Sequence, residues 1–283
     1  MKVVVVTDAM RSFGLDMVSE LCREGYFVIA IARNGKESEL IKKTVLHRYG
    51  FAQIETFVGS FSTVREMRQI VLNIRLLATE HRFEGIYALL CNQERVYGKY
   101  KLNEDGIERS YMENYFVNIF LADSLMDFLQ KEKDSRIIVP TLAQSQLVGI
   151  NMNDMFNKDA FEPQSVVRQC KFANAMMAGY INATYNVGEN PVRAVLYEAR
   201  DVATDDELDN EKEQGKLARF LNKPTEFETL MNTIIAAIND KARGITCYRA
   251  SKPVQPPSIC ANKEVCEQFW LMSQKVTKLR YFD

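Results

Sequence analysis

The sequence is poor in the residues from which metal centres and hydrolytic triads are built. Only two histidines, His47 and His81, occur among 283 residues, and the six cysteines form no Cys-x-x-Cys pair. Zinc sites draw on clustered histidine and cysteine, and a Ser-His-Asp triad needs a histidine beside its nucleophile. We therefore expect no metal ligands and no triad. Scattered cysteines are typical of free thiols in a reducing compartment, which predicts a cytoplasmic protein.

Long apolar runs and an excess of one charge are also missing. No stretch approaches the ~20 consecutive apolar residues of a membrane-spanning helix, and the formal net charge is −1. Neither nucleic acid nor an anionic membrane surface would attract such a chain. We therefore expect no nucleic-acid partner and no membrane span. The 47% apolar and 26% charged residues are ordinary for a globular protein that can bury its own core.

Buried strands alternate with amphipathic helices from the first residues onward. The expected strands are Val3–Val6, Phe27–Ala32, Ile54–Val58, Ile86–Cys91, Arg136–Val139 and Val192–Tyr197. The expected helices are Leu15–Glu24, Lys36–Tyr49, Thr63–Thr79, Ile107–Lys131, Val166–Thr184 and Thr225–Lys241. This alternation predicts an α/β fold, a doubly wound parallel sheet with helices on both faces.

No repeat or linker divides the chain, so we expect a single domain over residues 1–283. A C-terminal extension is expected from about residue 245. Within it, the proline-containing stretch Cys247–Ala261 is predicted to be ordered coil, and Lys263–Thr277 a final helix.

Glycine is scarce where the first strand meets the first helix. A loop that binds a dinucleotide there uses glycines so that its backbone can approach the diphosphate at the helix end. The segment from Thr7 to Gly14, TDAMRSFG, resembles the Thr-Gly-x-x-x-Gly-x-Gly loop of the short-chain dehydrogenase/reductase family. Thr7 and Gly14 match the pattern, whereas Asp8 and Ser12 replace two glycines. Alternatively, Asp8 and Ser12 cap a helix that begins near Phe13.

The resemblance continues to the end of the chain and is closest to the retinol-dehydrogenase-like branch of that family. The matching segments, in order, are Ile29–Asn34, Asp105–Glu108, Met112–Asn114, Ser135–Ala143, Lys171–Asn174 and Phe269–Ser273. The resemblance implies hydride transfer between a nicotinamide and an alcohol or carbonyl carbon. It also implies that Arg33, which follows the second strand, favours the 2′-phosphate of NADP.

The proton-transfer residues that the resemblance implies are incomplete. Lys171 matches the family's lysine, Asn114 its helical asparagine, and Thr141 falls near its catalytic serine. The family's tyrosine stands four residues before the lysine, where this chain has Val167, and valine has no proton to transfer. Lys171 and Asn114 also have structural alternatives, because the lysine can form an ion pair and the asparagine can bond backbone at a helix kink.

The cofactor positions have changed as well. The Asn-Asn-Ala-Gly motif becomes Cys91-Asn92-Gln93-Glu94, Ser60 stands where the family's aspartate receives the adenine amine, and Thr204 matches a threonine that meets the nicotinamide amide. The cofactor-binding candidates are Thr7, Gly14, Arg33, Ser60, Asn92 and Thr204. We expect weak or absent NAD(P) binding, with NADP preferred through Arg33.

Two functions remain open from the sequence. One is a pseudoenzyme, which keeps the reductase fold in order to bind an apolar small molecule or a protein partner. The alternative is an active NADP-dependent oxidoreductase that acts on an apolar alcohol or carbonyl with a substitute proton donor. The resemblance further implies a homo- or hetero-dimer through the helices at 107–131 and 166–184.

Overall fold

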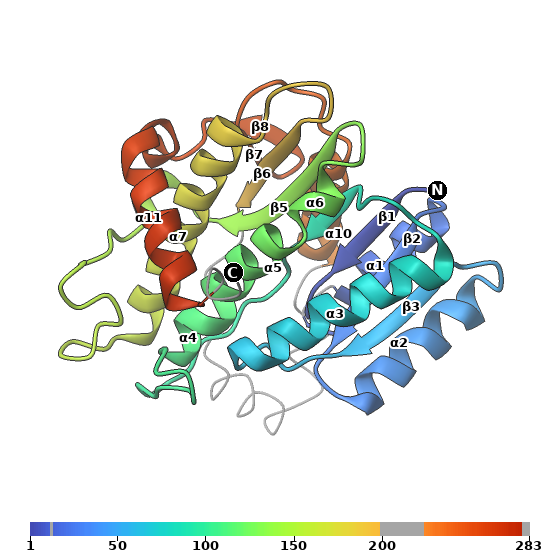
Figure 1. Ribbon diagram of the computed structural model, residues 1–283, viewed down its shortest axis with the longest axis horizontal. Coiled ribbons are helices and arrows are strands. Elements are labelled where there is room, and N and C mark those ends of the chain that lie inside the picture. The colour runs from blue at the N-terminus through green and yellow to red at the C-terminus, as the bar shows by residue number, and fades with distance from the viewer. Residues whose placement is uncertain (12–13, 199–223, 279–283) are drawn as a thin grey trace.

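The computed structural model describes residues 1–11, 14–198 and 224–278. Within them, a single eight-stranded sheet lies between two layers of helices (Figure 1). Its strands are β1 Val3–Val6, β2 Phe27–Ala32, β3 Ile54–Val58, β4 Ala88–Leu90, β5 Ser135–Thr141, β6 Val192–Glu198, β7 Thr246–Arg249 and β8 Lys252–Val254. They are arranged in the order β3-β2-β1-β4-β5-β6-β7-β8, and all neighbours are parallel except the β7–β8 pair. The predicted doubly wound α/β fold is therefore confirmed.

The apolar strands are buried on both faces because successive side chains of a strand point to opposite sides. Val3 and Val5 of β1 belong to one core with helices α3, α5, α7 and α11, and Val4 and Val6 to another with α1, α2 and α10. The helices are α1 Gly14–Arg23, α2 Gly35–Arg48, α3 Val64–His81, α4 Arg109–Tyr111, α5 Val117–Ser124, α6 Met126–Leu129, α7 Pro163–Thr184, α10 Pro224–Ile238 and α11 Lys263–Val276. α7 begins three residues earlier than expected, because Glu162 caps it and Pro163 suits its first turn.

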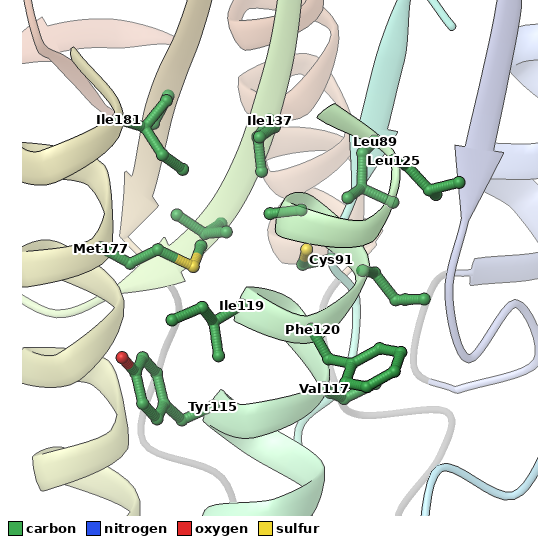
Figure 2. Close-up of a cluster of buried hydrophobic side chains, with 14 of the residues drawn as sticks. Leu89, Cys91, Tyr115, Val117, Ile119, Phe120, Leu125, Ile137, Met177 and Ile181 are labelled. Carbon is green, nitrogen blue, oxygen red and sulfur yellow. The ribbon is translucent and has the colours of Figure 1, made fainter. Parts of the chain in front are cut away.

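The core beneath α5 and α7 fixes these two helices against the sheet. Figure 2 shows Leu89 of β4 and Ile137 of β5 facing Ile119 and Phe120 of α5, with Met177 of α7 beside them. All these side chains are buried. Because interiors are close-packed, such contacts leave the helices little freedom to shift. The backbone that carries Asn114 and Lys171 is thereby held in place.

The helix expected as one piece at 107–131 is broken in the structure. It runs as α4, the π-helical turn η1 Met112–Phe116, α5 and α6, with a non-helical residue at Leu125. The side-chain amide of Asn114 donates to Ser110 O, and that of Asn118 donates to Asn114 O. Side-chain donors of this kind compete for the carbonyls of a regular helix and favour irregular turns.

The prediction of coil at Cys247–Ala261 is also wrong for the first half of that segment. Residues 246–254 form β7 and β8, which extend the sheet beyond β6, and η3 Ser258–Ala261 is a 3-10 turn. Proline at 253 does not prevent this pairing, because β8 is the edge strand and proline is tolerated where no neighbour needs its N–H.

Helix α11 packs on α7 and α5, the surfaces that the resemblance implies for a dimer (Figure 1). Trp270 stacks on Tyr180 of α7 with ring centroids 4.5 Å apart, Ser273 Oγ lies 2.8 Å from Tyr115 Oη, and Gln274 bonds Asp123. Part of these helix faces is thus covered by the chain itself. All six cysteines are buried as free thiols, and no helix of the described ranges has the length and apolar character needed to cross a membrane.

Candidate functional site

The candidate site lies at the carboxyl ends of β1 and β4, where the strand order reverses. β1 sits between β2 and β4, with β3 beyond β2 and β5 beyond β4. Doubly wound sheets bind ligands in the crevice at such a switch point. The loops after β1, β4 and β5 meet there with η1 and the first turns of α7. Two predicted positions, Ser12 and Thr204, lie outside the described residues.

Thr7, Asn92 and Gly14 join the loop after β1 to the loop after β4. Thr7 Oγ1 donates to Gln93 Oε1 at 2.7 Å and accepts from Asn92 N at 2.9 Å, and Asn92 Nδ2 donates to Asp8 O at 3.1 Å. A Cβ at Gly14 would lie 2.7 Å from the Ala9 carbonyl and 3.0 Å from Asn92 Nδ2. The surviving motif glycine is therefore required by close packing between the two loops.

Of the two alternative caps for α1, Ser12 lies outside the described residues, and Asp8 directs its carboxylate elsewhere. Its backbone is in the left-handed region, φ 44°, and its carboxylate turns toward β2, where Oδ2 lies 2.9 Å from Arg33 Nε. The same guanidinium reaches Glu113 Oε2 at 2.8 Å and Ser60 O at 2.9 Å. Both carboxylates are 1% exposed. Burial by itself lowers the pKa of Arg33, but the two carboxylates raise it overall, so the guanidinium stays charged.

Ser60 belongs to the start of α3. Its hydroxyl lies 2.6 Å from Glu66 Oε2, and Glu66 forms a capping box with Thr63. Burial raises the pKa of Glu66, but hydrogen bonds from Ser60 and Ser62 and from the backbone outweigh it, so the net shift is downward. The Ser60 hydroxyl, at the position predicted to meet the adenine amine, is thus hydrogen-bonded to Glu66, the ionised residue of the capping box.

Lys171 is buried, and its ammonium pairs with a carboxylate instead of a phenol. Nζ lies 2.6 Å from Glu94 Oε1, and the lysine is 1% exposed. Val167, one helical turn earlier, is buried and offers only methyl groups. Thr141 Oγ1 donates to the backbone carbonyl of Lys171 at 3.3 Å. The structure thus brings the predicted Lys171, Val167 and Thr141 together and places Glu94 on the amine.

Asn114 bonds backbone on three sides. Its amide accepts from Arg95 N and donates to Arg95 O, both at 2.7 Å, and donates to Ser110 O. The carbonyl of Asn114 accepts from the amides of Asn118 at 3.0 Å and Asn174 at 3.4 Å. Asn114 therefore holds the loop after β4 against η1, as its structural alternative predicted, and neighbouring amides use its carbonyl.

Two other tyrosines, Tyr97 and Tyr180, are engaged with partners other than Lys171. Tyr97 Oη donates to Glu113 Oε1 at 2.5 Å, with the Arg109 guanidinium 3.9 Å from its ring centroid. Tyr180 packs on Trp270. Among the described residues, neither phenol is hydrogen-bonded to Lys171.

Sequence reasoning missed the roles of Glu94 and Glu113. One signal was available for each, because Glu94 stands at the glycine of the Asn-Asn-Ala-Gly motif and Glu113 directly precedes Asn114. Their charge is opposite to that of the retained Lys171 and Arg33. In the part of the chain that the structure describes, no three histidine, cysteine or acidic side chains gather as metal ligands would.

Comparison with known proteins yields distant relatives of one kind, although no family model matches the chain. Polyprenol dehydrogenase of Homo sapiens is 19% identical over 98% of this chain and 85% of its own length. The WW domain-containing oxidoreductase of Gallus gallus is 22% identical over 49% of this chain. The chain spans only about a third of the latter protein, at 32% of its length, and 47% of the human dehydrogenase/reductase SDR family member 12.

Solved structures agree on the fold. An uncharacterized protein from Mycobacterium paratuberculosis superposes with a TM-score of 0.73 at 19% identity, covering 98% of this chain and 94% of its own. A metagenomic short-chain oxidoreductase in complex with NADP superposes with a TM-score of 0.54 at 16% identity, covering 71% of this chain and 82% of its own. The chain is therefore similar to short-chain dehydrogenases/reductases in sequence and in fold.

Proposed function

We propose that this chain is a non-catalytic protein with the short-chain dehydrogenase/reductase fold, kept for binding a ligand or a partner. The observation that carries the proposal is the state of Lys171, whose ammonium lies 2.6 Å from Glu94 while Val167 stands one turn before it. In the family the lysine serves a tyrosine that exchanges a proton with the substrate oxygen. With valine there, the lysine has no phenol to activate, and its charge is balanced by a carboxylate.

The residues present do not fit an NADP cofactor. Arg33, which would meet the 2′-phosphate, already contacts Asp8, Glu113 and the Ser60 carbonyl. A phosphate near Asp8 would bring like charges together at a partly buried site. We propose that NAD(P) binds weakly or not at all, and that any residual preference is for NADP.

For the ligand we propose an apolar small molecule. A relative covering nearly the whole chain is named polyprenol dehydrogenase, which suggests a long apolar alcohol as the first compound to test. The competing function, an NADP-dependent oxidoreductase with a substitute proton donor, would reveal itself by turnover of such an alcohol.

We propose that a protein partner binds this chain at a surface other than the two helices that the resemblance implies for a dimer. α11 already packs on α5 and α7, so a homo- or hetero-dimer through 107–131 and 166–184 would require α11 to move. Six free thiols favour a reducing compartment and hence a cytoplasmic location.

The proposal is tested by following NADPH consumption and NADP reduction with polyprenol, retinoids, steroids and small aldehydes. We expect no turnover, and calorimetry with NADPH and NADH should give no binding at micromolar concentration. Clear turnover that Lys171→Ala abolishes would overturn the proposal. Lys158→Ala is the matched control, because Lys158 is an exposed lysine outside the site.

A further inference from the structure

We propose that the chain's own carboxylates act as internal counter-ions at the candidate site: Asp8 and Glu113 hold Arg33, and Glu94 holds Lys171. The site then disfavours phosphorylated nucleotides, and neutralising Asp8 and Glu113 would convert Arg33 into a binding site for a phosphomonoester. The inference rests on the proposed function only in taking the unmodified site to be without a bound dinucleotide.

The contacts of Arg33 come from three separate segments of the chain. Asp8 lies in the loop after β1, Glu113 in η1, and the Ser60 carbonyl after β3. The Arg33 side chain is 14% exposed, and the carboxylate side chains beside it are each 1% exposed. A guanidinium is a rigid fork of donors suited to carboxylate or phosphate. Here its Nε and Nη1 face carboxylates, while its buried Nη2 has no hydrogen-bond partner within the described part of the chain. An incoming phosphate would have to displace the carboxylates or approach their charge.

Lys171 has its charge partner in the loop after β4. That loop is joined to its surroundings by Asn92 to Asp8 O, by Glu94 to Lys171, by the Arg95 backbone to Asn114, and by Tyr97 to Glu113. Arg95 Nε also lies 3.6 Å from Asp8 Oδ2. The two clusters are therefore linked, and the acids Asp8, Glu94 and Glu113 lie beside the cations Arg33, Arg95 and Lys171. These acids reduce the local positive charge that a dinucleotide would need.

Replacing the Asp8 and Glu113 carboxylates with amides should allow Arg33 to bind a phosphate. Asp8→Asn with Glu113→Gln keeps the shape of both side chains and leaves Arg33 charged without a carboxylate. A poorly solvated cation is stabilised by an added anion, and the ligand stabilises the folded state in proportion to its binding. The gain needs no catalysis, so it is measurable as binding alone.

The test compares the wild type, the Asp8→Asn/Glu113→Gln variant and Asp127→Asn by calorimetry and thermal melting with adenosine 2′,5′-bisphosphate. Asp127 pairs with Arg75 at the surface, so it controls for lost negative charge. We expect at least tenfold tighter binding and a larger rise in melting temperature for the double variant only. Adding Arg33→Gln should abolish the gain.

Equal binding by the wild type and a folded double variant would overturn the inference, as would a gain that survives Arg33→Gln. Should the double variant fail to melt cooperatively, Glu113→Gln alone must show a smaller gain, and no gain there also overturns it. Any of these results would leave the proposal of a non-catalytic protein untouched. Turnover by the wild type would contradict that proposal, but it would not test the effect of Asp8 and Glu113 on phosphate binding.

Discussion

Glu108 is a buried carboxylate at the start of α4. It caps the helix through Tyr111 N, and burial raises its pKa from the ordinary 4.5 to about 7, against hydrogen bonds that lower it. Because the folded pKa is above the unfolded one, the folded state binds the extra proton between these values. The free energy of unfolding should therefore fall as pH rises from about 4.5 to 7, by at most about 3 kcal/mol.

We expect Glu108→Gln to remove this part of the pH dependence, because the amide still accepts the Tyr111 N–H but does not titrate. Urea unfolding at a series of pH values from about 4 to 8, which spans this window, measures the slope. Glu104→Gln, at an exposed position in the same loop, should leave the slope unchanged. An identical slope in wild type and Glu108→Gln would contradict the prediction.

Val167→Tyr restores the missing hydroxyl but should not restore activity. A positioned proton donor contributes typically ~10²–10⁴ in rate, yet Lys171 remains paired with Glu94 and Arg33 with Asp8 and Glu113. We expect no NADPH consumption above background with the substrate panel. Turnover by this single variant would show that the cofactor site is intact, and Val166→Tyr, a buried neighbour on the same helix, controls for the added aromatic volume.

At the scale of elements, the contact between α7 and α11 depends on Gly179. A Cβ there would lie 2.7 Å from Cys266 Sγ and 2.8 Å from the Cys260 carbonyl. We expect Gly179→Ala to lower the free energy of unfolding by about 1–3 kcal/mol through overpacking, despite alanine's higher helix propensity. Chemical denaturation measures the change.

Gly35→Ala is the matched control, since it is also helical and a Cβ there meets nothing within 4 Å. It should be neutral or slightly stabilising. Equal stability of Gly179→Ala and the wild type would mean that α11 can shift on α7 without cost.

At the scale of the whole molecule, α11 makes the α5–α7 face part of the chain's own core. We expect a monomer of 32.5 kDa in light scattering, because Trp270 and Phe269 already bury against this face. Apolar surface that is covered within the chain gives no drive for association. A dimer whose subunits cross-link through α5 or α7 would contradict this expectation.

The layered α/β fold could be predicted from the pattern of apolar residues along the sequence. Unbroken apolar strands such as Val3–Val6 and Phe27–Ala32 can be stable only in a sheet covered on both faces, and the alternating helices supply that cover. The helix expected at Thr63–Thr79 also begins within one residue of α3, where Thr63 and Glu66 form a capping box. The apolar pattern of a strand and the cap of a helix depend on residues that are close in sequence. Such features can therefore be predicted from the sequence.

The partners of the site residues could not be predicted from the sequence and are seen in the folded structure. Asp8 and Arg33 are 25 residues apart, Lys171 and Glu94 lie on different elements, and Asn114 bonds Arg95 across a loop. Ion pairs depend on distance in space, and sequence spacing fixes that distance only within one helix or strand. The same reason explains why β7 was not expected as a strand, because its parallel partner β6 lies in a distant segment of the chain.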